Sequence, residues 1–245
     1  MNTRLQLELT VTLGTFSLSA ALRLGDEPLA LIGPNGAGKT SLLLAIAGLL
    51  TPETGTLSLG DAKLFDRAQR VDVPTEARAI AYMPQDDALF PHLSALGNVE
   101  FAVAARHPAW TRAQTAERAH ALLKELEATP LAPRKPAQLS GGERQKIALV
   151  RALGAEPRAL LLDEPLAALD ATARRQVRAF LFEHVAALKL PALVVTHDPD
   201  DVRALGGRVA ALEAGRVIQT GSLDELRAAP KSPFIAQFAG ATGAP

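Results

Sequence analysis

Residues 33–41 have the types and spacing of a loop that binds phosphate groups. Its glycines let backbone amides approach an anion, and the amides at the start of the following helix point toward it. Lys39 would add a positive charge beside the outer phosphates, and the Thr40 hydroxyl could bind Mg²⁺. The predicted phosphate-binding residues are Gly33, Pro34, Asn35, Gly36, Ala37, Gly38, Lys39, Thr40 and Ser41. A glycine-rich turn that binds nothing is the alternative, but it does not explain why every motif position is filled.

Two carboxylates, Asp163 and Glu164, follow the apolar segment 159–162. Such a run indicates a buried strand, and the ligands of parallel sheets lie at the carboxyl ends of strands. At that edge Asp163 would hold hydrated Mg²⁺, and Glu164 would orient or deprotonate an attacking water molecule. A solvated strand end is the alternative interpretation, and a neighbouring phosphate loop makes it weaker.

A second candidate anion site begins at Ser140. Ser140 and Glu143 have the spacing of a capping box at the start of a helix. Gly141 and Gly142 would let the backbone amides of that helix approach an anion. One nucleotide pocket has no use for a second helix end of this kind, so the segment predicts a pocket completed by a second copy of the chain. A purely structural helix cap is the alternative.

The elements that must position these residues alternate between strands and helices. The apolar run 29–32 precedes the phosphate loop, and the helical stretch 41–48 follows it and ends at glycine. The runs 159–162 and 193–195 flank the helical stretch 171–188, which is typical of a crossover between parallel strands. We therefore predict an α/β fold with a parallel sheet.

Further regions surround this core. The alternating segments 5–9 and 16–19 indicate half-exposed strands, whereas the strand signal disappears between about 89 and 150. Helical stretches such as 112–127, broken by prolines, replace it there and indicate a helical insertion. The predicted single domain, 1–245, divides into a core at about 1–88 and 151–221, a helical subdomain at about 89–150, and a short helix and tail at 222–245.

Composition excludes several classes of protein. The chain of 245 residues is 48% hydrophobic and can bury a core, and its 26 basic and 26 acidic residues give no field that would attract nucleic acid. It contains no cysteine, which excludes disulfides and thiolate metal sites. Its apolar runs are far shorter than the roughly 20 residues that span a bilayer. The charged, alternating residues 1–9 predict a strand and not a signal peptide.

Four segments resemble one family. Leu139–Gln145, with the sequence Leu-Ser-Gly-Gly-Glu-Arg-Gln, resembles the signature of ATP-binding cassette (ABC) ATPases. Leu169–Asp170 and Thr196–Asp198 are similar to that family's D-loop and switch histidine, and Tyr82–Gln85 to its Q-loop. The resemblance implies a P-loop NTPase (RecA-like) core with a parallel sheet, an antiparallel β subdomain and an inserted α-helical subdomain. It also implies ATP and Mg²⁺ as cofactors and a head-to-tail homodimer that sandwiches two ATP molecules.

The resemblance also gives roles to single residues. His197 would contact the γ-phosphate or the attacking water, Gln85 would contact Mg²⁺ and that water, and Asp170 would belong to the nucleotide site. Gln85 would also couple the nucleotide state to a partner, because it lies where the core meets the helical insertion. Family members stack adenine on an aromatic residue upstream of the phosphate loop. Phe16 is the candidate here, and a core position in its strand is the alternative.

Two regions resemble particular importers. The segment 87–99 is similar to the one that follows the Q-loop in bacterial importer ATPases, and the segments 13–16 and 22–26 are most similar to molybdate/tungstate-type importers. This implies a separate transmembrane permease and, indirectly, a periplasmic or extracellular solute-binding protein. It implies no nucleic acid, and a peripheral location on the cytoplasmic face of the bacterial inner membrane. Because the stretch after His197 is short, we expect no C-terminal regulatory domain.

Two alternative functions remain open. One is a soluble cassette protein that acts on nucleic acid or ribosomes. Such chains usually carry a long coiled coil or two cassettes in tandem, and this sequence shows neither feature and no basic cluster. The other is a regulator that binds ATP without hydrolysing it, which the presence of both Glu164 and His197 opposes.

Overall fold

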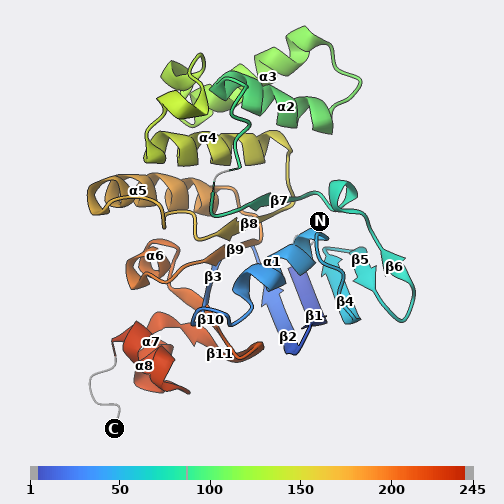
Figure 1. Ribbon diagram of the computed structural model, residues 1–245, viewed down its shortest axis with the longest axis vertical. Coiled ribbons are helices and arrows are strands. Elements are labelled where there is room, and N and C mark those ends of the chain that lie inside the picture. Colours follow the sequence, from blue (N-terminus) through green and yellow to red (C-terminus); the bar gives the residue numbers. More distant parts are fainter. Residues whose placement is uncertain (1–4, 87, 241–245) are drawn as a thin grey trace.

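A sheet of eleven strands runs through the part of the chain that the computed structural model describes, residues 5–86 and 88–240 (Figure 1). Its strand order is β6-β5-β4-β1-β2-β11-β10-β3-β9-β8-β7. The strands are β1 (Leu5–Leu13), β2 (Phe16–Leu24), β3 (Leu29–Ile32), β4 (Thr54–Leu59), β5 (Ala62–Asp66), β6 (Val71–Asp72), β7 (Ile80–Met83), β8 (Ala159–Asp163), β9 (Ala192–Val195), β10 (Arg208–Glu213) and β11 (Arg216–Ser222). Asp87 of the importer-like segment and the predicted domain's residues 1–4 and 241–245 lie outside the described residues.

The parallel part of the sheet is covered on both faces. β10, β3, β9, β8 and β7 pair in parallel in that order. On one face, Leu31 of β3 packs in a core with Leu42 of α1 (Lys39–Ala47). On the other face, Ile32 packs in a second core with Phe182 of α5 (Ala171–Ala187). Burial on both faces explains why the sequence of these strands is apolar throughout and not alternating.

The antiparallel part of the sheet alternates in burial. β1 pairs with β2 and β4, and its Leu5, Leu7 and Leu9 are buried while Gln6 and Glu8 are exposed. The alternation in the sequence therefore predicted these strands correctly, although both run further than the predicted segments.

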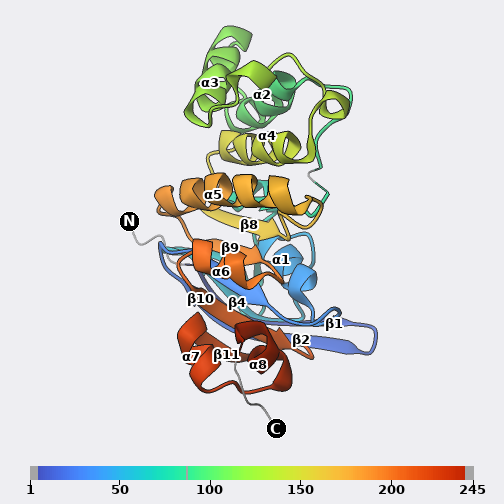
Figure 2. The same cartoon turned by 90° about the vertical axis from the view of Figure 1, so that its left-hand side faces the viewer.

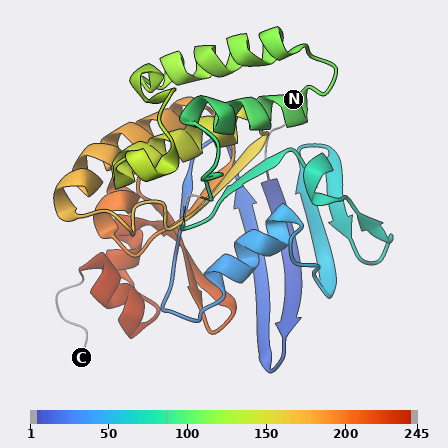
Figure 3. The same ribbon diagram turned by 45° about the horizontal axis from the view of Figure 1, so that its top comes forward.

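Three helices form a separate layer at one end of the molecule (Figure 1, Figure 3). They are α2 (Ala95–Arg106), α3 (Arg112–Glu125) and α4 (Gly141–Gly154). The 3-10 turns η2 (Thr129–Leu131) and η3 (Pro136–Gln138) link α3 to α4, and η1 (Thr75–Ala77) precedes β7. α4 packs against α5, so this layer rests on the helix that covers the parallel sheet.

The C-terminal region contains more structure than the sequence indicated. α6 (Pro199–Ala204) precedes β10, and α7 (Leu223–Ala228) and α8 (Pro233–Ala239) follow β11 (Figure 2). We expected a tail where α8 lies. The helix forms because Ser232 caps it, Pro233 occupies its first turn, and Ile235 and Phe238 are buried. Within residues 5–86 and 88–240, no helix has both the length and the apolar character needed to cross a membrane.

Candidate nucleotide site

The phosphate loop joins β3 to α1 in a conformation that depends on glycine. Gly38 is the N-cap of α1 with φ 101°, and its helix end receives no side-chain hydrogen bond. Gly36 also has a positive φ, 77°. A Cβ on Gly33 would collide with the backbone carbonyl of Leu212 in β10. The loop is therefore held close to the sheet, and the first amides of α1 are left available to an anion.

Lys39 is folded onto its own loop. Its Nζ donates to the carbonyl oxygens of Gly33 at 2.9 Å and Pro34 at 3.1 Å, and the residue is only 8% exposed. Burial lowers the pKa of Lys39, while the nearby Glu164 and Asp163 act to raise it. The ammonium group is thus positioned beside both carboxylates, at the edge where phosphates would lie.

Asp163 ends β8 and lies next to Thr40, the first residue after Lys39. Its carboxylate accepts hydrogen bonds from the Thr40 hydroxyl and from Tyr82 Oη, the latter at 3.3 Å. Burial raises the pKa of Asp163, and the two hydrogen bonds act to lower it. Burial and the neighbouring Asp163 raise the pKa of Tyr82 to about 12.

The donor set at this point fits Mg²⁺. A hydroxyl and a carboxylate lie side by side at the phosphate loop, and Mg²⁺ commonly takes one or two protein oxygens together with waters and phosphate oxygens. The described residues contain no group of three or more His, Cys, Asp or Glu side chains that could hold a metal without such additional ligands. Thr40 and Asp163 are therefore the residues that could hold the ion, and Gln85 is the third predicted ligand.

Glu164 and His197 lie together at the ends of the adjacent strands β8 and β9. Glu164 Oε2 is 3.6 Å from His197 Nδ1. Glu164 has φ 46°, an unusual value for a residue with a side chain, and its amide donates to the carbonyl of Val195 at 3.1 Å. The left-handed conformation costs about 1–2 kcal/mol. The sequence predicted both residues for the site, and it gave no sign of this strained backbone.

Phe16 lies beside the phosphate loop. The space that a Cβ on Gly38 would occupy is 3.0 Å from its ring, and the ring is half-buried against the core that contains α1. Phe16 could therefore both pack in the core of its strand and stack on adenine, because its ring borders both the core and the loop. Gln85 lies two residues after the end of β7 and is exposed.

The signature segment lies in the helical layer, apart from the phosphate loop. In Figures 1 and 2, α4 and α1 lie on opposite sides of α5 and β8. Ser140 and Glu143 form the predicted capping box: the Ser140 hydroxyl accepts from the Glu143 amide at 3.3 Å, and Glu143 Oε2 accepts from the Ser140 amide at 2.8 Å. One copy of the chain therefore does not bring this segment to the phosphate loop.

The signature glycines also have a packing role that the sequence did not indicate. A Cβ on Gly141 would lie 2.7 Å from Leu169 Cδ2, and one on Gly142 would lie 2.6 Å from Val177 Cγ2. Both residues thus let α4 approach the D-loop and α5. Asp170, the D-loop residue predicted for the site, is the N-cap of α5 and accepts hydrogen bonds from the amides of Thr172 and Ala173.

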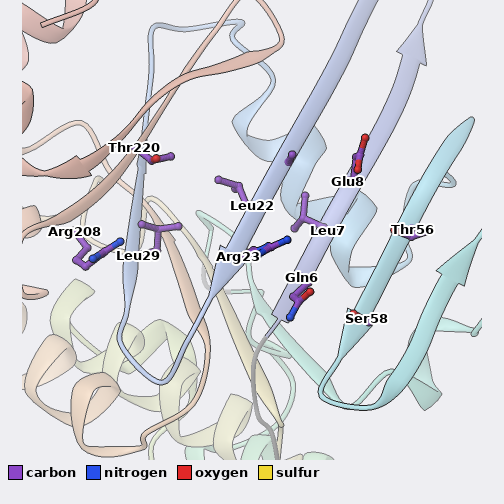
Figure 4. A pocket seen from close by; sticks show the side chains of 11 residues that line it. Gln6, Leu7, Glu8, Leu22, Arg23, Leu29, Thr56, Ser58, Arg208 and Thr220 are labelled. Carbon is purple, nitrogen blue, oxygen red and sulfur yellow. The ribbon is translucent and has the colours of Figure 1, made fainter.

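A hollow of about 610 Å³ lies elsewhere, on the outer face of the sheet (Figure 4). Gln6, Glu8, Arg23, Thr56 and Arg208 are among its lining residues, and none of the predicted site residues lines it. It is the solvent side of the antiparallel strands, whose alternate residues point away from the core. This hollow therefore does not coincide with the candidate nucleotide site, despite its volume.

Residues 18–167 match the family described as ABC transporter. The chain belongs to this family. Among ABC proteins, it is 44% identical over 227 residues to the molybdenum import ATP-binding protein ModC of Mycobacterium tuberculosis (strain ATCC 25618 / H37Rv), covering 92% of this chain and 60% of that protein. It is 43% identical over 217 residues to the sulfate/thiosulfate import ATP-binding protein CysA of Brucella melitensis biotype 1, covering 87% of this chain and 58% of that one.

A solved ABC structure is similar over most of this chain. The dimeric, post-hydrolysis ATP-binding cassette MJ0796 bound to ADP and Pi shares a TM-score of 0.73 and 29% identity, covering 89% of this chain and 98% of that one. This likeness confirms the predicted cassette fold. The chain spans about three fifths of the length of the ModC and CysA relatives.

Two residues near this site were not predicted from the sequence. Tyr82, in the segment before Gln85, donates to Asp163. Arg174, in α5, contacts both the D-loop and Asp198. The position of Tyr82 in a strand ending at the Q-loop could have indicated its contact. The contacts of Arg174 join segments far apart in the sequence, and no spacing rule reveals them.

Proposed function

We propose that this chain is the ATP-binding and ATP-hydrolysing subunit of an ABC importer. The observation that carries the proposal is the split between two helix ends. Lys39, Thr40, Asp163, Glu164 and His197 converge at one of them, whereas the signature segment lies in another layer of the same chain. A pocket that needs both is completed by a second copy packed head to tail.

Each residue then has a role in hydrolysis. Lys39 turns from the carbonyls of its own loop to the outer phosphates of ATP, and the loop amides of residues 33–41 hold them. Glu164 orients and deprotonates the attacking water, and His197, 3.6 Å away, contacts that water or the γ-phosphate. Ser140, Gly141, Gly142 and Asp170 act on the nucleotide of the opposite copy, and Phe16 stacks on adenine.

Mg²⁺ would be held by Thr40, Asp163 and Gln85. When bound, it neutralises charge on the phosphates and on the buried Asp163 carboxylate. Burial raises the pKa of that carboxylate, so the charge is costly until a cation faces it.

The ModC and CysA relatives support uptake of an oxyanion, with molybdate as the first candidate. The partners would be a separate permease and, indirectly, a solute-binding protein, which places the subunit peripherally on the cytoplasmic face of the membrane.

The permease would dock beside the helical subdomain at about 89–150. There Phe101 is 54% exposed, and its ring packs edge-on against Phe90 at 4.7 Å. The core would comprise about 1–88 and 151–221, with a helix and tail at 222–245.

Mixing two inactive variants tests the shared pocket. Lys39→Ala removes the phosphate-loop cation, and Ser140→Arg blocks the signature segment. A dimer with one copy of each has one intact pocket, so we expect random pairing to restore about a quarter of the wild-type ATPase rate. Mixtures as inactive as each variant alone would contradict the proposal. Purified wild-type protein should also show specific activity that rises with protein concentration, whereas a constant value from nanomolar to micromolar would contradict dimer-dependent hydrolysis.

A further inference from the structure

Arg174 contacts two separate segments of the candidate site. Its Nη2 donates to the carbonyl oxygens of Ala167 at 3.4 Å and Leu169 at 3.3 Å, both in the segment that leads to Asp170. Its Nη1 lies 3.9 Å from Asp198 Oδ2. Because Asp198 follows His197 in the chain, one guanidinium group joins the D-loop to the switch-histidine segment.

The residues on both sides of His197 form a stiff unit. The Thr196 hydroxyl donates to Asp201 at 2.6 Å and accepts from the Asp198 amide at 3.1 Å. Arg178, one turn after Arg174 on α5, binds Asp201 at 2.6 Å and Asp198 at 2.5 Å. Arg178 thus joins two carboxylates of this segment by charge-assisted hydrogen bonds, which are shorter and stronger than neutral ones. A displacement of Asp198 would therefore move His197 as well.

The network borders the catalytic pair directly. A small cavity of about 10 Å³ has Glu164, His197 and Arg174 among its lining residues. On the other side of the D-loop, Leu169 Cδ2 lies 2.7 Å from the space that a Cβ on Gly141 would fill. The D-loop thus touches the signature helix at one side and Arg174 at the other.

Arg174 is poorly placed for stability alone. Its Nε is buried and has no hydrogen-bond partner among the described residues, which costs free energy. It also lies near the N-terminus of α5, where the helix dipole disfavours a cation. These two costs disfavour a purely stabilising role, and the three contacts of Arg174 with two separate segments point to a role at the site.

We propose that Arg174 is a positioning residue that makes the orientation of His197 depend on the position of the D-loop. The inference rests on the proposed ATPase function. When a second copy presses on residues 167–170, the guanidinium transmits the displacement through Asp198 to His197. His197 already lies 3.6 Å from Glu164 in the single chain, and it takes its final orientation toward Glu164 in the closed dimer, so that hydrolysis requires the second copy.

Arg174→Gln tests the proposal, with Arg175→Gln as the matched control on the exposed side of the same helix. We expect Arg174→Gln to lower kcat about tenfold while the KM for ATP and the nucleotide Kd stay unchanged, because the contacts align the site without touching nucleotide. Arg174→Lys should recover part of the loss, since one ammonium group keeps the charge but cannot make all three contacts. Arg175→Gln should remain within twofold of wild type.

Asp198→Asn supplies the second arm of a double-mutant cycle. If Arg174 acts through Asp198, Arg174→Gln should lower kcat less than twofold in the Asp198→Asn background. A full tenfold loss there would overturn the proposal. So would an Arg174→Gln kcat within twofold of wild type, or a loss of ATP affinity equal to the loss of kcat.

The same assays separate this inference from the proposed function. Wild-type protein without ATP hydrolysis would contradict the function itself, whereas active wild type with an unaffected Arg174→Gln variant would contradict only the positioning role. Should Arg174→Gln fail the folding check by circular dichroism, Arg174→Lys replaces it in the same cycle and the same thresholds of coupling apply.

Discussion

The helices α1 and α4 both have glycine at or next to their N-terminus, but their N-terminal amides are capped in different ways. α1 begins at Gly38 without a side-chain cap, and its amides face the phosphate loop. α4 begins at Ser140, whose capping box with Glu143 already satisfies two backbone amides from within the chain. The N-terminus of α1 therefore has free amides that could bind a ligand. The N-terminus of α4 is already capped within the chain, and in the proposed function it acts only when a second copy brings a nucleotide to it.

The far end of each helix extends the contrast. Arg78 is fully buried, and its Nη1 donates to the carbonyls of Ala45 at 3.0 Å and Ile46 at 2.9 Å in the last turn of α1. The helix that follows the candidate phosphate loop is thus held at its C-terminus, which keeps its N-terminus in place. α4 rests on α5 and lies in the separate helical layer, where its N-cap Ser140 is exposed and residues 141–144 are half-buried.

Removing the carboxylate beside α1 should have the largest effect. In Glu164→Gln, we expect ATP hydrolysis to fall at least about 100-fold, because the amide cannot accept a proton from water. Binding of ATP should persist, since Lys39 and the loop are intact. Rate and nucleotide affinity can be measured on the same preparation, with Glu183→Gln on the exposed face of α5 as the control. Unchanged hydrolysis would refute the role of Glu164.

Releasing the C-terminus of α1 should affect stability next. Arg78→Ala leaves the buried carbonyl oxygens of Ala45 and Ile46, and the half-buried one of Val73, without their donor. We expect the free energy of unfolding in urea to fall by about 3 kcal/mol. The exposed Arg67→Ala variant should change it by less than about 0.5 kcal/mol. Equal stability of the two variants would show that the buried guanidinium does not hold α1.

We expect the smallest effect from removing a helix cap, which can be tested at two capping boxes with the same hydrogen-bond pattern. Ser140 at α4 and Thr111 at α3 each accept from the amide three residues later, both at 3.3 Å. Replacing either residue with alanine should cost about 1 kcal/mol of unfolding free energy. Only Ser140→Ala should also lower the ATPase rate, because in the proposed dimer only that helix end meets the nucleotide of a second copy. An equal ATPase rate in both variants would make the Ser140 cap purely structural.

The sequence predicted well those parts of the molecule whose causes are local. The strand over 29–32 was located to the residue, and α5 ends one residue before its predicted end, because apolar runs and capping residues act over short distances. The capping box at Ser140 was predicted from two residues and is present.

The parts that were missed depend on contacts between distant segments. Arg78 binds residues more than thirty positions away, and Arg174 joins two loops that meet only in the folded chain. α8 was missed because its few apolar residues follow a stretch rich in proline and polar residues, although Ser232 and Pro233 are its start signals. For the glycines of α4, the sequence suggested approach of an anion, and the packing against Leu169 and Val177 required the tertiary structure.

Glu164 has a strained backbone, with a φ of 46°, which lowers the stability of the fold. The same residue carries the carboxylate that the proposed hydrolysis requires. Glycine would relieve the strain there and remove the carboxylate together with it. Selection for heat resistance alone would therefore tend to enrich inactive proteins at this position. A screen for more heat-resistant variants that keep the proposed ATPase activity should hold Glu164 fixed and vary the rest of the chain.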